Sequence, residues 1–138
     1  MYITLTKKRI FILLCVIVLV FLILIQFFSV KADYIDVSTN AKRVAYITAL
    51  GITLKSDEFS KKDTVIPWQF GDVYNKYNTL QKQSGFDLSS YKGQNITIYT
   101  YNYDTYKVVN LIVYKGGLIG GDICDLQIDG QMLPLKKT

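Results

Sequence analysis

The sequence predicts an α+β fold, in which an N-terminal transmembrane helix precedes a small domain with two helices packed on one face of an antiparallel sheet. A run of nineteen residues near the N-terminus carries no charge, which indicates a membrane span. Two later stretches repeat apolar residues at helical spacing, and the last third consists of strand-like runs separated by turn residues. After the span, these stretches give the order α-β-β-α-β-β-β, and the 138 residues suffice for one such domain.

The apolar run from Ile10 to Phe28 has the length and composition of a membrane span. As a helix it is roughly 28 Å long at about 1.5 Å per residue, close to the thickness of the hydrocarbon core. Its one amide is Gln26, and Cys15 is interpreted as a small lipid-facing hydrophobe. The cations Lys7 to Arg9 directly precede the run, which favours an N-terminus inside the cell and a C-terminal domain outside.

The sequence leaves open whether this segment is retained. Val30 to Ala32 has the small or β-branched residues that a signal peptidase reads, so cleavage after Ala32 would give a secreted protein. The run exceeds the roughly 7–15 apolar residues of a signal peptide, however, and this favours an uncleaved signal anchor. The predicted organisation is a basic flank (1–9), an anchor (10–28), a linker (29–37) and an extracytoplasmic domain (38–138).

The net charge of +5 does not indicate a nucleic-acid partner. Four of the sixteen basic residues flank the apolar run, and from Asp33 onward 12 basic residues face 11 acidic ones, a net of +1. Nucleic-acid surfaces need clustered basic residues, and these are scattered. The chain has no His, which excludes Ser-His-Asp and Cys-His catalysis and His-ligated zinc. No metal and no cofactor is predicted.

The first helix of the domain is expected to run from a cap at Ser38 or Thr39 to about Leu50, with Gly51 as its terminator. Its apolar face comprises Ala41, Val44, Ile47 and Leu50. Two short strands are then expected, with a charged loop between them. They cover Ile52 to Leu54 and Thr64 to Ile66.

The second helix follows Pro67, although Gly71 can delay its start to Asp72, and Gly85 ends it. The expected inward stripe consists of Val73, Tyr77, Leu80 and Ser84. The expected outer face carries Asn75, Lys76, Gln81 and Lys82. Trp68 is expected to anchor the core or the helix start.

The last third predicts an antiparallel meander of three strands. Residues 94–103 and 106–115 are joined by a turn at Asp104-Thr105. A second turn at 115–117 leads into residues 118–128, and Asp129-Gly130 makes a third turn.

The densest group of unusual residues is Gly120 to Asp125. Two glycines permit close backbone approach, so Asp122 and Asp125 are candidate ligand-binding residues, although a strand bulge with two surface acids explains the pattern equally simply. With Asp129 they match no calcium loop. Cys124 has no His to activate it and is interpreted as structural.

Tyr99, Tyr101 and Tyr103 share one face of a predicted strand and are also candidates for ligand binding. An exposed aromatic face can stack on sugars or hold a peptide. Cross-strand tyrosine pairs that simply stabilise a half-buried sheet are the alternative.

Two stretches, VIPWQFGDVYNKYNTLQKQSGFDLSSYKG and NLIVYKGGLIGGDICDLQIDG, resemble a domain family of unknown function. The family occurs in small membrane-anchored or secreted proteins of clostridia and related Gram-positive bacteria, and the resemblance covers roughly Asn40 to Asp129. It implies a short N-terminal membrane or signal segment and one envelope-facing domain. It implies no activity and no catalytic residues.

Two functions are compatible with these observations. The favoured one is a noncatalytic protein that is anchored in the lipid bilayer through Ile10 to Phe28 and binds an unidentified envelope protein or polymer. The alternative is a carboxylate-dependent cell-wall hydrolase with Asp122 and Asp125 as acid and base. Positions i and i+3 of a strand point to opposite faces, which argues against that pair.

Overall fold

The computed structural model describes residues 7–28 and 34–136, with the side chains of residues 24–28 left out. In this part of the chain three α-helices accompany one five-stranded antiparallel sheet, so the α+β class is confirmed. The chain divides into two units between Asp33 and Tyr34. The predicted cleavage site at Val30 to Ala32 lies outside the described residues.

The first unit contains one helix, α1 (Lys7–Phe28). Its apolar side chains from Ile10 to Ile23 are exposed. Among the described residues, no helix combines the length and the apolar character needed to cross a membrane. The transmembrane role of the run stays a prediction.

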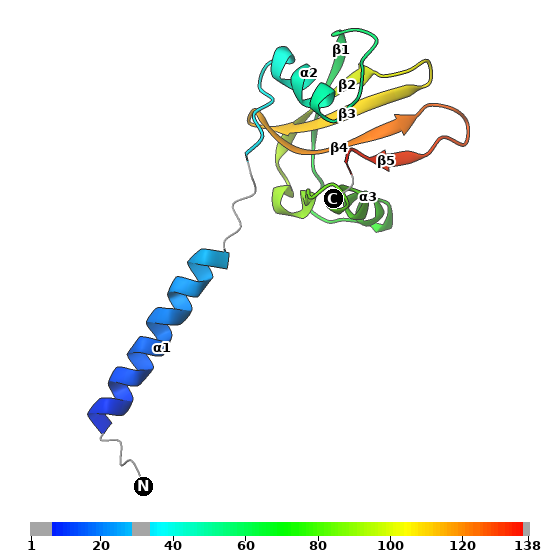
Figure 1. Cartoon of the computed structure of the whole chain (residues 1–138). Coiled ribbons are helices and arrows are strands. Elements are labelled where there is room, and N and C mark those ends of the chain that lie inside the picture. The colour runs from blue at the N-terminus through cyan, green and yellow to red at the C-terminus, as the bar shows by residue number, and fades with distance from the viewer. Residues whose placement is uncertain (1–6, 29–33, 137–138) are drawn as a thin grey trace. The chain divides into compact units, whose positions relative to one another are not determined.

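The second unit contains the sheet and two further α-helices (Figure 1). Its elements are α2 (Asn40–Ala49), β1 (Phe59–Val65), α3 (Asp72–Lys82), a 3-10 helix η1 (Leu88–Tyr91), β2 (Asn95–Asn102), β3 (Lys107–Tyr114), β4 (Gly117–Asp125) and β5 (Met132–Pro134). The strands lie side by side in chain order, each antiparallel to its neighbours. The predicted meander is therefore confirmed, and β1 and β5 extend it on either side.

The expected strand at Ile52 to Leu54 is wrong, because this segment completes the end of α2 instead. The Ile52 N–H donates to the Ile47 carbonyl, and the Ile52 side chain enters the core. The charged stretch that follows, expected to be a loop, forms most of β1 from Phe59 onward. An edge strand with charged side chains remains solvated on its free side, so polarity does not prevent pairing with β2.

The two helices cover opposite faces of the sheet, not one face as expected (Figure 1). Ile47 of α2 packs with Tyr101, Leu111 and other residues of one face. The apolar residues on the other face, which α3 covers, form a second cluster. It contains Ile66, Leu88, Ile96, Ile112 and Ile119, with Tyr74 and Tyr77 of α3 packed against it.

Helix α3 starts at Asp72, as its sequence allows, and its inner face keeps Tyr77, Leu80 and Ser84 of the predicted stripe but not Val73. Val73 is 83% exposed, whereas Asn78 and Gln81 are buried. Gln81 was placed on the outer face by its polarity and is fully buried against β4. Trp68, expected to anchor the core or the helix start, does not lie in the core: it is 74% exposed, with its ring packed over Gly93.

Helix α2 is fixed to the sheet by a buried arginine. Its start is the predicted cap, since the Thr39 hydroxyl accepts from the Lys42 N–H. One turn later Arg43 is 4% exposed, and its Nε donates to the Tyr101 hydroxyl at 2.7 Å. Its Nη1 donates to the Val37 carbonyl, and the guanidinium lies 3.7 Å from the centre of the Tyr99 ring. These contacts satisfy a cation that polarity alone would place in solvent.

We expect Arg43→Met to lower the free energy of unfolding by about 1–3 kcal/mol, because buried acceptors lose their donor while the apolar stem is kept. Lys42→Met is the matched control, since its ion pair with Asp36 is exposed to solvent and contributes little to stability. Urea unfolding followed by circular dichroism measures both. Equal losses in the two variants would contradict the role given to Arg43.

Candidate functional site

A row of polar side chains crosses the sheet on the face that α3 covers. The strand register places Thr100 of β2 opposite Asn110 of β3, and Asn110 opposite Asp122 of β4. Cys124 lies two residues further along β4, on the same face. Tyr77 reaches this row from α3, the helix that covers this face of the sheet. We call these five residues the polar row.

Hydrogen bonds connect the whole polar row. Thr100 Oγ1 donates to Asn110 Oδ1 at 2.7 Å, and Asn110 Nδ2 donates to Asp122 Oδ1 at 2.9 Å. The Tyr77 hydroxyl donates to Asp122 Oδ2 at 2.6 Å, and Cys124 Sγ donates to Asp122 Oδ1 at 3.1 Å. The carboxylate therefore accepts three hydrogen bonds, and both of its oxygens are used.

Burial and the Asp122 carboxylate set the protonation of the neighbouring groups. Asp122 is 2% exposed, and among the described residues no lysine or arginine nitrogen makes an ion pair with it. Burial, and then the negative charge of Asp122, raise the pKa of Tyr77 well above its usual range. Burial, and then the hydrogen bond to Asp122, raise the pKa of Cys124 to about 12. The phenol and the thiol are therefore protonated at neutral pH.

This arrangement is suited to holding α3 on the sheet and not to catalysis. A general base needs a free lone pair within reach of its substrate, and Asp122 is sealed under Tyr77. Cys124, interpreted from the sequence as structural, is held as a thiol. Gln81 adds a second attachment, since its Oε1 accepts from the Gly121 N–H at 2.8 Å.

The structure does not bring Asp125 to the polar row. Asp125 ends β4 on the opposite face, as the strand alternation predicts, and its Oδ1 accepts from the Gln127 N–H. Asp125 instead lines an open hollow of about 920 Å³ beside the β4–β5 connection, together with Asp129. Among the described residues, no group of three or more acidic or cysteine side chains is placed to hold a metal ion.

The three candidate tyrosines lie on the α2 face, Tyr99 and Tyr101 in β2 and Tyr103 directly after it. Tyr101 is fully buried, and its hydroxyl donates to Asn40 Oδ1 at 2.6 Å. Tyr99 lies under the Arg43 guanidinium, and Tyr103 packs at the edge of the same cluster. The open aromatic face considered from the sequence is thus covered at Tyr101, whereas ligand binding at Tyr99 and Tyr103 stays a prediction.

Comparison with known proteins gives one family. The model of the family described as Domain of unknown function (DUF4830) matches residues 50–119, which include β1, α3, β2 and β3. The match lies within the stretch on which the resemblance in sequence rests, and it carries no information on bacterial group or membrane anchor. No curated protein and no solved structure matches the chain.

We expect Tyr77→Phe to lower the free energy of unfolding by about 1–3 kcal/mol, because one oxygen of the buried Asp122 carboxylate loses its donor. Tyr106→Phe is the matched control, since Tyr106 is 55% exposed. Thermal and urea unfolding measure the difference. A loss no larger than that of the control would show that the Tyr77 hydroxyl contributes little to holding α3.

We expect the Cys124 thiol to react slowly in the folded chain. Its pKa of about 12, against 9.0 for an ordinary cysteine, lowers the thiolate fraction at pH 8 about 1000-fold. Alkylation by iodoacetamide, followed by peptide mass mapping, should be correspondingly slower than in urea. Above about pH 9 the unfolded thiol loses a proton that the folded thiol retains, so the free energy of unfolding should fall as the pH rises. Similar alkylation rates in the folded and unfolded chains would contradict this environment.

Proposed function

The chain belongs to the DUF4830 family, and from its own residues we propose that it is a single-pass membrane protein whose C-terminal domain lies outside the cell. There the domain binds another component of the envelope without catalysing a reaction. The sealing of Asp122 beneath Tyr77 is the observation that carries the noncatalytic part of the proposal.

The sequence of the first unit supports the anchor. No helix of the described residues is long and apolar enough to cross a membrane, so the support comes from the uncharged run, which continues to Phe28, beyond the last described side chain at Ile23. Lys7 to Arg9 at the start of α1 favour an inside N-terminus. A lipid bilayer is the first partner that this proposal implies.

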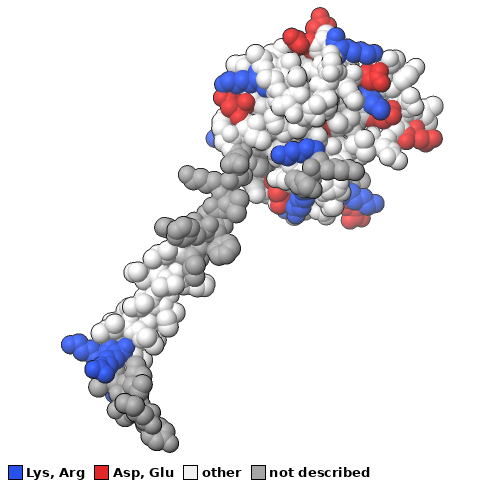
Figure 2. Space-filling view, viewed as in Figure 1, with Lys and Arg blue, Asp and Glu red and all other residues white. Residues whose placement is uncertain are grey.

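The surface of the domain supports binding over catalysis. Figure 2 shows basic and acidic side chains interspersed on the face that it displays, which is typical of a mixed, solvated surface. The two carboxylates of the alternative hydrolase, Asp122 and Asp125, lie on opposite faces of the sheet. A pair that flanks one glycosidic bond has to share one cleft. Exposed apolar side chains such as Trp68 and Val73 offer contact area for a partner.

Protease treatment of intact protoplasts tests the proposal. We expect a C-terminal epitope tag on the full chain to be digested, while a cytosolic control protein is protected. Replacement of Lys7, Lys8 and Arg9 by Ser should increase the protected fraction, because it removes the charges that set orientation. The mass of the membrane-extracted chain should include residues 1–32. A protected tag would refute the outside location, and a mass beginning at Asp33 would refute the anchor.

The noncatalytic part has a separate test. Purified full chain is incubated with cell-wall polymer, and the soluble products are measured beside those from Asp122→Asn. We expect neither protein to release products above background. Product release that is lost in Asp122→Asn would overturn the proposal in favour of the hydrolase.

A further inference from the structure

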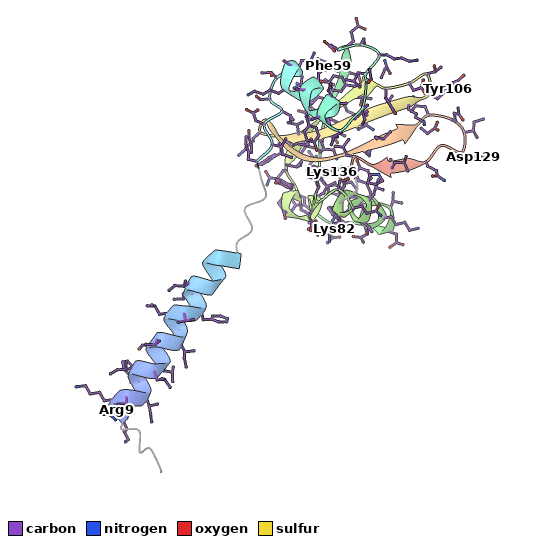
Figure 3. All side chains as sticks on the ribbon, in the orientation of Figure 1. Arg9, Phe59, Lys82, Tyr106, Asp129 and Lys136 are labelled. Atoms are coloured by element: carbon purple, nitrogen blue, oxygen red, sulfur yellow. The ribbon has the colours of Figure 1, made fainter. Side chains whose placement is uncertain are left out.

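One end of the sheet carries a group of exposed apolar side chains around the hollow described above. The β4–β5 connection holds Ile128 fully exposed, and Leu126 is 63% exposed. Figure 3 shows Tyr106, from the connection of β2 to β3, at the same end of the sheet as Asp129. We call this end the hairpin surface. Its apolar members are the exposed Tyr106, Leu126, Ile128 and Leu133 and the half-buried Ile123.

Leu126 and Ile128 are exposed on a loop whose backbone is held by hydrogen bonds. The Leu126 N–H donates to the Tyr106 carbonyl at 2.6 Å, and the Gly130 N–H donates to the Gln127 carbonyl at 2.8 Å. A Cβ at Gly130 would lie 2.0 Å from the Asp125 carbonyl oxygen, so the turn requires glycine. The backbone therefore presents Leu126 and Ile128 to solvent in a fixed arrangement. Exposed apolar groups of this kind mark interaction sites.

The hairpin surface also carries charges of both signs without ion pairs. Lys107 lines the hollow, and among the described residues it has no carboxylate within ion-pair distance. Asp129 at the tip of the loop also has no hydrogen bond or ion pair in the described part of the chain. Asp125, which lies opposite Lys107 in the strand register, also makes no ion pair among the described residues. The surface therefore offers one cation, two carboxylates, apolar projections and a hollow, so a second copy can supply a carboxylate to its cation and apolar groups to its hollow.

We propose that the hairpin surface docks a second copy of this chain about a two-fold axis. Leu126 and Ile128 of each copy enter the hollow of the other, and Lys107 pairs with the partner's Asp129. In a two-fold interface the same patch serves both copies, so the pairing of Lys107 with Asp129 and the burial of Leu126 and Ile128 each occur twice. This self-association goes beyond the proposed function and does not depend on the anchor.

Two features favour a second copy over a lipid surface. The loop places Asp125 and Asp129 beside its apolar side chains, and carboxylates are repelled by the anionic lipids of membranes. The chain also enters the domain at the opposite end of β4, where Asp36 bridges to Gly117. The nine residues of β4 span about 30 Å at roughly 3.3 Å each. The hairpin surface therefore lies about 30 Å from the point at which the chain enters the domain.

Sedimentation equilibrium of the full chain in density-matched zwitterionic detergent tests this proposal. We expect the wild type to dimerise and the double variant Leu126→Ser/Ile128→Ser to associate about tenfold more weakly or less. Lys107→Glu and Asp129→Lys should each weaken association, and their combination should restore it, because the charges are then exchanged. Val73→Ser is the control, since it removes an apolar group of similar exposure from α3. Circular dichroism verifies that each variant is folded.

Each alternative result has a defined meaning. A monomeric wild type would overturn the proposal and leave the surface to an unlike partner. Dimers that persist in the Leu126→Ser/Ile128→Ser variant would place the contact elsewhere and also overturn it. A charge exchange that fails to restore association would refute the pairing of Lys107 with the partner's Asp129. None of these results bears on the protoplast test, so the two proposals can fail separately.

Discussion

Burial of the central strand on both of its faces is the constraint on which the domain is built. The residues of β3 alternate between the two apolar clusters, so each face needs its own helix. Apolar contact alone does not fix a helix in one position, because it has no direction. Here each helix adds a directional, buried polar contact. Arg43 of α2 donates to Tyr101, and Tyr77 of α3 donates to Asp122. Together, these two contacts fix α2 on one face of the sheet and α3 on the other.

The parts of the fold that sequence predicts well are local. The cap at Thr39, the glycines after both helices and the turns of the meander depend on a few neighbouring residues, and all are found. The placement of both helices on one face was wrong, although the sequence held a sign of it. The stretch VVNLIVY in β3 lacks polar alternation, and such a run is typical of a strand buried on both faces. The segment at Ile52 to Leu54 was too short for its apolar pattern to distinguish a strand from a helix end.

The candidate site was only partly predictable because its members come from separate elements. Asp122 and Cys124 stood out by composition, but Asn110 and Tyr77 become their neighbours only through strand register and helix position. Gln81 was misplaced for a related reason. A polar side chain is assigned to solvent by default, since its burial is costly unless a partner is present. Its partner is a backbone N–H of β4, forty residues away in sequence, and no local pattern indicates it.

The way in which the chain enters the domain has a mechanical consequence. Residues 35–37 are held to the start of β4 by two backbone hydrogen bonds, from Val37 N–H to the Gly116 carbonyl and from Leu118 N–H to the Ile35 carbonyl. Any tension transmitted from the N-terminal side reaches these two bonds before it reaches the long ladders of the sheet. Val37 lies wholly in the core beside α2. We therefore expect residues 35–37 to detach from the sheet under load before the strand ladders separate, which would expose the core side chains beneath α2.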